Sequence, residues 1–246
     1  MTLIGHHHVE HVMGMPISID IRDDPPDGAA LVDAVVEWFH WVDATFSTYK
    51  PDSVVSRLAA GELARAEAPV VVQEVLALCD ELWAETDGYF DASSGGRLDP
   101  SGVVKGWAVD AASDMLLAGG SANHCVNAGG DVRTRGHPEG DQLWQVGIAH
   151  PQVYDALCAV VAIGDGAVAT SGTAERGLHV LDPHTGLAAV DLASVTVVGP
   201  DLTRSDAYAT AALAMGMDAP EWLARLPGHE AVVVDAGGHM WSKRLG

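Results

Sequence analysis

Apolar residues recur at helical spacing in two long stretches of the N-terminal half. In residues 29–46 and again in residues 69–85, the apolar side chains fall three or four positions apart, which is the spacing of one face of an α-helix. The first stretch ends before Pro51, because the residue that precedes a proline avoids the helical region. The second ends before Gly88, a residue that suits the C-terminal end of a helix. The pattern therefore predicts two amphipathic helices.

A strand-like alternation precedes the first helix. The three isoleucines of residues 17–21 alternate with polar residues. This two-residue period predicts one strand over residues 9–21, with the pair Met13-Gly14 inside it. We expect residues 1–8, with their consecutive histidines, to form a flexible arm ahead of this strand.

Shorter patterns of the same two kinds predict the remaining elements. They are a short turn or helix over residues 52–58, helices over residues 107–118, 203–215 and 218–226, strands over residues 124–128, 144–148, 156–163, 177–181 and 194–198, and a hairpin of residues 231–235 and 239–241. Helices and strands are interleaved irregularly, and no internal repeat or long linker divides the chain. A hydrophobic content of 48% is enough for a substantial core. We predict a single α+β domain over residues 1–246.

The charge of the chain limits its partners. With 13 Lys and Arg against 34 Asp and Glu, the formal net charge is −21. This excess argues against binding to nucleic acid, which needs a basic surface, and against docking on an anionic membrane. It still allows an anionic small ligand, because a metal ion or a few local donors can reverse the local field.

Nothing in the chain predicts membrane insertion or export. No window holds about 18 uninterrupted apolar residues, and the N-terminus lacks the basic and apolar regions of a secretory signal. The three cysteines stand too far apart for a CxxC motif, and their odd number suits a reducing compartment. We expect a cytoplasmic protein in which Cys79, within an apolar run, is a buried and inert hydrophobe.

Two oxygen-bearing side chains stand one helical turn apart in the predicted helix 203–215. Asp206 and Thr210 are four residues apart, so they share one helix face. A carboxylate and a hydroxyl suit Mg²⁺, which takes few protein ligands and leaves positions for substrate phosphates. The spacing also fits a structural role, in which Thr203 caps the helix and Asp206 completes a capping box. The spacing alone leaves both interpretations open.

Two further segments carry candidate chemistry. Residues 99–106 predict a turn that leads into a helix, so their amides and Lys105 could receive a phosphate; an ordinary helix entry with a solvated lysine fits as well. His179, on a predicted strand, could act as a general acid or base, although a lone histidine is more often structural. The GxxxxGK[ST], GxSxG, HExxH and GxGxxG motifs are absent. A P-loop, a serine hydrolase, a zinc protease and a Rossmann site are therefore not indicated.

Several short segments stand in a particular order along the chain. They are Met13-Gly14, FSTY at 46–49 with Asp52-Ser53 and SRL at 56–58, TDGYFD at 86–91, DPSGVVKGWAVD at 99–110, NAGGD at 127–131, TSG at 170–172 with Glu175-Arg176, HVLDPHTG at 179–186, and SDAYAT at 205–210. In this order they resemble the FAD:protein FMN transferases, the ApbE family. The order is far more specific than any one segment.

The resemblance implies an ApbE-like fold, related to the T-fold, in which mixed sheets and packed helices form one domain. It implies that FAD is held by the residues that match the family's FAD-binding positions, which are Met13, Tyr49, Tyr89, Phe90, Asp91, Asp99 and Lys105. It also implies a Mg²⁺ ion, with Mn²⁺ as a possible substitute, bound by the backbone carbonyl of Gly102 and by the side chains of Asp206 and Thr210.

The implied reaction cleaves the pyrophosphate of FAD, moves FMN onto a threonine hydroxyl of an acceptor protein and releases AMP. A metal bridging the two phosphates would neutralise charge on the leaving group. His179 matches a family histidine near the transferred group, and His179 or a nearby carboxylate is our candidate for the base that takes the threonine proton. Two other functions stay open: a Mg²⁺-dependent FAD pyrophosphatase that yields FMN and AMP, and a carrier that binds FAD without turnover.

The chain departs from the family pattern at three places. The segment between Asp91 and Asp99 is short, which could expose the flavin to water and favour hydrolysis. Gly102 and Ser205 stand where many members have alanine, and a glycine is compatible with a ligand that is a backbone carbonyl. The lipoprotein signal of exported members is not found, so we expect a short, cytoplasmic form whose acceptor the sequence does not name.

Overall fold

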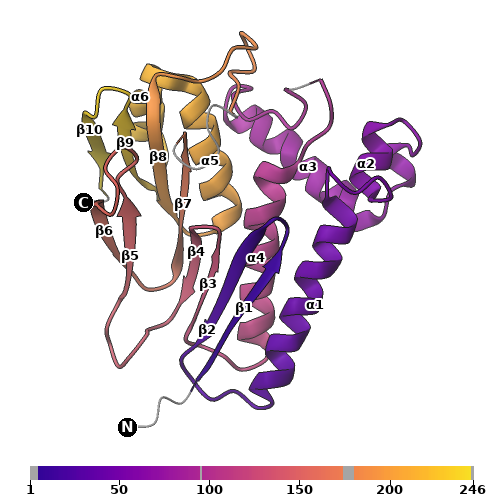
Figure 1. The fold of residues 1–246 in the computed structure, drawn as a ribbon, viewed down its shortest axis with the longest axis vertical. Coiled ribbons are helices and arrows are strands. Elements are labelled where there is room, and N and C mark those ends of the chain that lie inside the picture. The colour runs from indigo at the N-terminus through magenta and orange to yellow at the C-terminus, as the bar shows by residue number, and fades with distance from the viewer. Residues whose placement is uncertain (1–4, 95, 174–179, 245–246) are drawn as a thin grey trace.

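The computed structural model describes residues 5–94, 96–173 and 180–244. Its helices and strands form a large sheet, a separate small sheet and a layer of helices (Figure 1). The strands are β1 (His6–Val12), β2 (Met15–Ile21), β3 (His124–Ala128), β4 (Asp131–Arg135), β5 (Trp144–Ala149), β6 (Leu157–Ile163), β7 (Gly166–Gly172), β8 (Leu192–Gly199), β9 (Glu230–Asp235) and β10 (Met240–Lys243). The helices are α1 (Gly28–Phe46), α2 (Val54–Ala59), α3 (Val70–Glu85), α4 (Ser101–Ala118), α5 (Leu202–Met215) and α6 (Ala219–Arg225), with short 3₁₀ helices η1 (Arg65–Glu67) and η2 (Gly216–Asp218).

The large sheet is the framework of the described chain. Eight strands are hydrogen-bonded in the order β1-β2-β3-β4-β7-β8-β9-β10, and each neighbouring pair is antiparallel. Strands β5 and β6 leave this order between β4 and β7 and pair with each other. The predicted α+β class is confirmed, because helices pack on antiparallel sheets without a repeating βαβ unit.

Helices α1, α4 and α5 pack against this sheet (Figure 1). The residues of β2 that form the core are Ile17, Ile19 and Ile21, each at most 1% exposed, as the two-residue period predicted. On β8, Val195 and Val197 are fully buried. The bounds of α1 and α3 agree with the two stretches of helical spacing to within one residue.

Helix α5 is almost entirely buried between α4 and the strands β7 and β8. Only Arg204 and Thr210 among its residues escape burial, and five of its side chains are alanines. Small side chains let the neighbouring backbones come close. At Gly106 of α4, an added Cβ would lie 2.7 Å from the backbone oxygen of Leu202, so only a glycine fits the contact between the two helices.

The N-terminal prediction was wrong in two respects. Residues 9–21 are not one strand, because Met13 and Gly14 form the turn of a hairpin between β1 and β2, with φ of 57° and 75°. A two-residue turn of this handedness matches the twist of the strands. Strand β1 begins at His6, so residues 6–8 of the predicted arm belong to the sheet. Three consecutive histidines show no alternation of apolar and polar residues, so the sequence does not indicate a strand there. Their pairing with β2 identifies residues 6–8 as part of β1.

Helix α4 begins at Ser101 and not at the predicted Trp107. The Oδ1 of Asp99 accepts a hydrogen bond of 3.0 Å from the backbone N–H of Ser101. Most of the predicted turn over residues 99–106 is therefore helix, and Lys105 lies in its second turn. The two glycines of this segment lower its helix propensity, which is why the sequence pattern placed the start too late.

Strands β4 and β7 were not predicted, since neither shows a clear alternation of apolar and polar residues. The predicted strand over residues 177–181 is only partly testable, because residues 177–179 lie outside the described residues. Leu181 forms an isolated bridge with Ala188. Within the described residues, no helix is both long and apolar enough to cross a membrane.

Cys79 is buried in α3, as predicted. Burial raises the pKa of its thiol to about 12, because the low-polarity surroundings disfavour the thiolate. The side chain is therefore a protonated hydrophobe of the core.

His124 is fully buried at the start of β3 and is held in its neutral form. Its Nδ1 lies 3.1 Å from the carbonyl oxygen of Ser121, and its Nε2 lies 2.8 Å from the Oγ of Ser113. A neutral imidazole can donate at the first contact and accept at the second. Burial lowers the pKa of His124 to about 4, because the charged ring would lose its hydration.

We expect His124 to make the fold sensitive to acid. Its pKa is about 4 in the fold against an ordinary value of 6.5, so the unfolded chain binds the proton first as the pH falls. Above pH 6.5 His124 should have no effect on how the free energy of unfolding changes with pH. As the pH falls from 6.5 to 4, protonation of His124 in the unfolded chain should lower the free energy of unfolding by about 3 kcal/mol. Urea unfolding across this pH range measures the slope.

The variant His124→Gln should lack this slope, although it loses some stability at neutral pH. The matched control is His7→Gln, at an exposed position of β1, which should keep the slope of the parent protein. Equal slopes in the parent protein and both variants would contradict the prediction.

Candidate functional site

A cavity of about 1050 Å³ is lined by segments from distant parts of the chain. They include the turn between β1 and β2, the loop after α1, the segment between α3 and α4, and residues of α4, β5, β7 and α5. Each predicted FAD-binding or metal residue lines this cavity. These residues are Met13, Tyr49, Tyr89, Phe90, Asp91, Asp99, Gly102, Lys105, Asp206 and Thr210.

The predicted catalytic residue, His179, lies outside the described residues. Its neighbours Val180, Leu181 and Pro183 line the cavity. The role of His179 therefore stays a prediction.

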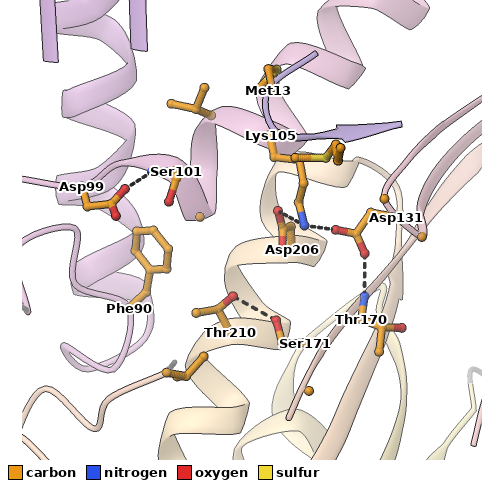
Figure 2. A pocket seen from close by; sticks show the side chains of 18 of the residues that line it. Met13, Phe90, Asp99, Ser101, Lys105, Asp131, Thr170, Ser171, Asp206 and Thr210 are labelled. Atoms are coloured by element: carbon orange, nitrogen blue, oxygen red, sulfur yellow. Dashed lines mark hydrogen bonds and ion pairs between the residues drawn. The ribbon is translucent and has the colours of Figure 1, made fainter. Parts of the chain in front are cut away.

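Lys105 lies between two carboxylates that line the same cavity (Figure 2). Its Nζ is 3.4 Å from the Oδ2 of Asp206 and forms a closer ion pair with the Oδ2 of Asp131. Burial by itself lowers the pKa of Lys105, but the charges of Asp206 and Asp131 together outweigh it and raise the pKa above its ordinary value. Lys105 is therefore a charged ammonium, most of whose side chain is buried.

Asp131 lines the candidate site, and the sequence analysis did not assign it a role. It starts β4, directly after Gly129 and Gly130, and is 2% exposed. Its Oδ1 accepts a hydrogen bond of 2.8 Å from the backbone N–H of Thr170 on β7. This contact and the ion pair with Lys105 hold the carboxylate in place. The GGD segment was the available signal, but only its glycines were interpreted.

Asp206 and Thr210 lie one turn apart on α5, as their spacing predicted (Figure 2). The Oγ1 of Thr210 is 3.0 Å from the Oγ of Ser171 at the end of β7. Asp206 is 3% exposed, whereas Thr210 is only half-buried. Two hydroxyls and a carboxylate, which are all hard oxygen donors, therefore lie along one wall of the cavity.

The capping-box interpretation of Asp206 is wrong. The cap of α5 is Asp201, whose side chain accepts a hydrogen bond of 2.8 Å from the N–H of Arg204. Thr203 lies inside the helix, and its hydroxyl donates to Asp110 on α4 at 2.6 Å. Asp206 lies beyond the third helical residue, where it takes no part in the cap and lines the cavity instead.

Aromatic and sulfur-bearing side chains line other parts of the cavity. Phe90 is 4% exposed, and its ring lies so near Gly102 that an added Cβ there would stand 3.1 Å from the ring. Tyr89 is in edge-to-face contact with His184, at 4.5 Å between ring centres. Tyr49 is 96% exposed. Apolar and aromatic surface beside charged groups suits a ligand that joins flat rings to phosphates.

The donors of this cavity fit Mg²⁺ better than a metal that needs a closed protein cage. Among the described residues, no group of three or more His, Cys, Asp or Glu side chains could hold a metal ion. Mg²⁺ needs only one or two carboxylates and completes its shell with water and phosphate oxygens. The charges of Lys105, Asp131 and Asp206 sum to −1, which leaves a negative charge for a cation to neutralise.

A family model described as the ApbE family matches residues 13–97 and 92–233. The chain belongs to the ApbE family. The matched residues include all the predicted site residues, so the resemblance found in the ordered motifs is confirmed.

The ApbE-family chain is similar to proteins named FAD:protein FMN transferase in several bacteria. It is 33% identical to the one from Vibrio cholerae over 129 residues, which are 48% of this chain and 39% of that protein. It is 32% identical to the one from Treponema pallidum over 162 residues, which are 58% of this chain and 45% of that protein. The chain spans less than half the length of these curated relatives in the matched regions.

Solved ApbE structures have the same fold. An ApbE protein from Thermotoga maritima gives a TM-score of 0.88 at 23% identity, with 98% of this chain and 97% of that chain covered. The flavin transferase ApbE from Vibrio cholerae gives 0.82 at 21% identity, with 97% of each chain covered. The predicted ApbE-like fold is confirmed.

We expect Lys105→Met to destabilise the fold strongly, because it leaves the carboxylates of Asp131 and Asp206 buried without their ammonium. Removing one partner of a buried ion pair costs about 3 kcal/mol or more, and urea unfolding at pH 7 measures the loss. The matched control is Arg65→Met, which breaks an exposed ion pair with Asp80 at 2.7 Å and should cost less than about 1 kcal/mol. Equal losses in the two variants would show that the site charges are not coupled as described.

Proposed function

We propose that this chain is a FAD:protein FMN transferase that depends on Mg²⁺, or on Mn²⁺ in its place. It would transfer FMN from FAD to a threonine hydroxyl of an acceptor protein and release AMP. The observation that carries the proposal is the convergence of Lys105, Asp131, Asp206 and Thr210, from α4, β4 and α5, in one cavity. The names of the relatives support the same activity.

The cavity provides separate surroundings for the two halves of such a substrate. Phe90, Tyr89 and Met13 supply aromatic and polarisable surface for flat rings. Lys105 supplies a fixed positive charge for a phosphate oxygen, and Asp131 holds that ammonium in place. Because the phosphates bring their own negative charge, a chain of net charge −21 needs such a local cation to bind them.

Asp206, Thr210 and the backbone carbonyl of Gly102 are the residues that would hold the cation. When bound, Mg²⁺ would supply charge neutralisation on the phosphates and on the leaving AMP. The residues of the chain would bind the cofactor, orient the phosphates and keep the site charges fixed. The transfer forms a bond between the threonine oxygen and phosphorus and breaks the pyrophosphate bond, so one proton must leave the threonine.

The acceptor of that proton is proposed to be His179 or a neighbouring carboxylate. The transfer rate of His179→Ala, measured with saturating FAD and acceptor, tests the first assignment. An unchanged rate would remove His179 from the mechanism and leave a carboxylate as the candidate.

The proposal predicts a cation-dependent protein modification that needs Asp206. The protein is incubated with FAD, Mg²⁺ and an acceptor domain that bears a family-type threonine site, and mass spectrometry follows the acceptor. We expect addition of FMN to the threonine, loss of this addition with EDTA, and a decrease of at least about 100-fold in Asp206→Asn, because the cation loses its carboxylate ligand. The matched control is Asp201→Asn at the cap of the same helix. Asp201 does not line the cavity, and asparagine can still cap the helix, so this variant should keep most of the activity.

Two outcomes would replace the transferase with another function. Free FMN and AMP, with several acceptor domains left unmodified, would indicate a FAD pyrophosphatase. FAD that is bound but recovered intact would indicate a carrier. Equal activity in Asp206→Asn and Asp201→Asn would contradict the assignment of the cation site.

A further inference from the structure

Asp110 joins the two helices that carry the proposed cation and phosphate site. It lies on α4, five residues after Lys105, and faces the first turn of α5. Its Oδ1 accepts a hydrogen bond of 3.0 Å from the N–H of Leu202, and its Oδ2 accepts one of 2.8 Å from the N–H of Thr203. The hydroxyl of Thr203 donates to the same Oδ2 at 2.6 Å. One carboxylate thus fixes the beginning of the helix that holds Asp206 and Thr210.

Asp110 also reaches the strand that carries the third charge of the site. Its Oδ1 is 3.1 Å from the Nε of Arg133 on β4, and both side chains are largely buried. Arg133 stands two residues after Asp131 on the same strand. The side chain of Asp110 therefore contacts α5 and β4 while standing on α4, and these three elements carry Asp206, Asp131 and Lys105.

Gly106 allows the backbones of α4 and α5 to pack directly against each other. An added Cβ at Gly106 would lie 2.7 Å from the oxygen of Leu202 and 2.8 Å from the Cα of Thr203. The backbones of the two helices are thus in contact one turn before Asp110. The glycine sets how near the helices come, and the hydrogen bonds of Asp110 set how far one is shifted along the other.

We propose that Asp110 is a positioning residue: it fixes the register of α5 and β4 against α4 and thereby holds Lys105, Asp131 and Asp206 in the arrangement that binds the cation and the phosphates. This inference rests on the proposed function. Asp110 is not among the residues that line the cavity, so it acts through the elements it joins. A misplacement of about 1 Å in reacting groups is enough to lower a rate strongly.

A second partly buried aspartate that accepts hydrogen bonds from backbone N–H groups provides the matched control. Asp23 accepts hydrogen bonds from the N–H groups of Ala122 and Asn123, at 2.7 and 2.8 Å, and from the hydroxyl of Ser121 at 2.8 Å. It thus joins distant segments through two backbone amides and one hydroxyl, as Asp110 does. It does not line the cavity. A purely structural role predicts the same consequences for both residues.

The test compares Asp110→Asn with Asp23→Asn in the full chain. Thermal unfolding, Mn²⁺ binding by electron paramagnetic resonance without FAD, and the kcat and KM of FMN transfer are measured for both. We expect both variants to unfold at lower temperature. Only Asp110→Asn should show a Mn²⁺ affinity that is lower by at least about tenfold. Only this variant should also have a lower kcat at a temperature where it is fully folded.

A milder variant keeps the inference testable if Asp110→Asn does not fold. Thr203→Val removes one of the hydrogen bonds to Asp110 and keeps the shape of the side chain, so it should weaken Mn²⁺ binding in the same direction and by less. Unchanged Mn²⁺ affinity in Thr203→Val, or equal affinities in Asp110→Asn and Asp23→Asn, would overturn the inference.

The two proposals fail in different ways. If the parent protein transfers no FMN but its Mn²⁺ affinity depends on Asp110 and not on Asp23, the proposed function fails and the positioning role stands. If the parent protein transfers FMN and the two aspartate variants behave alike, the positioning role fails and the proposed function stands.

Discussion

The arrangement of this site depends on one buried ammonium held between two carboxylates. Lys105, Asp131 and Asp206 lie on three different elements, and all three side chains are largely removed from water. Burying charges costs free energy that only close pairing offsets. The fold must therefore keep α4, β4 and α5 in register, because separating any one of them would leave a buried charge without its partner. The same requirement keeps the site preorganised before any ligand arrives.

The composition of α5 reflects this constraint. An acidic side chain can lie inside the protein only if the rest of its helix supplies enough apolar surface and approaches its neighbours closely. The alanines of α5 and Gly106 of α4 allow that approach. Asp201 and Asp110 accept hydrogen bonds from three N–H groups of the first turn, which would otherwise lack partners inside the helix. The close packing of α5, the hydrogen bonds to its first turn and the ion pair of Asp206 with Lys105 therefore all favour the same position of this helix.

The limits of prediction follow from the kinds of signal that a sequence carries. Periodic apolar residues gave α1 and α3 nearly to the residue, because helix burial imprints its period on the chain. The turn at Met13 was missed because its conformation depends on pairing between β1 and β2 and not on a strong turn motif. The early start of α4 was missed because Gly102 and Gly106 have low helix propensity, and tertiary packing overrides it.

The sequence by itself determined the family, because the ordered motifs, which include Lys105, Asp206 and Thr210, resemble those of the ApbE family, and the family model confirms the match. Tertiary structure alone decided that these residues meet, that Asp131 completes the charge set and that Asp110 ties their elements together. The physical reason is that ion pairs and caps between residues far apart in the chain leave no local periodicity. Their partners become visible only when the sheet and the helices bring them within hydrogen-bonding distance.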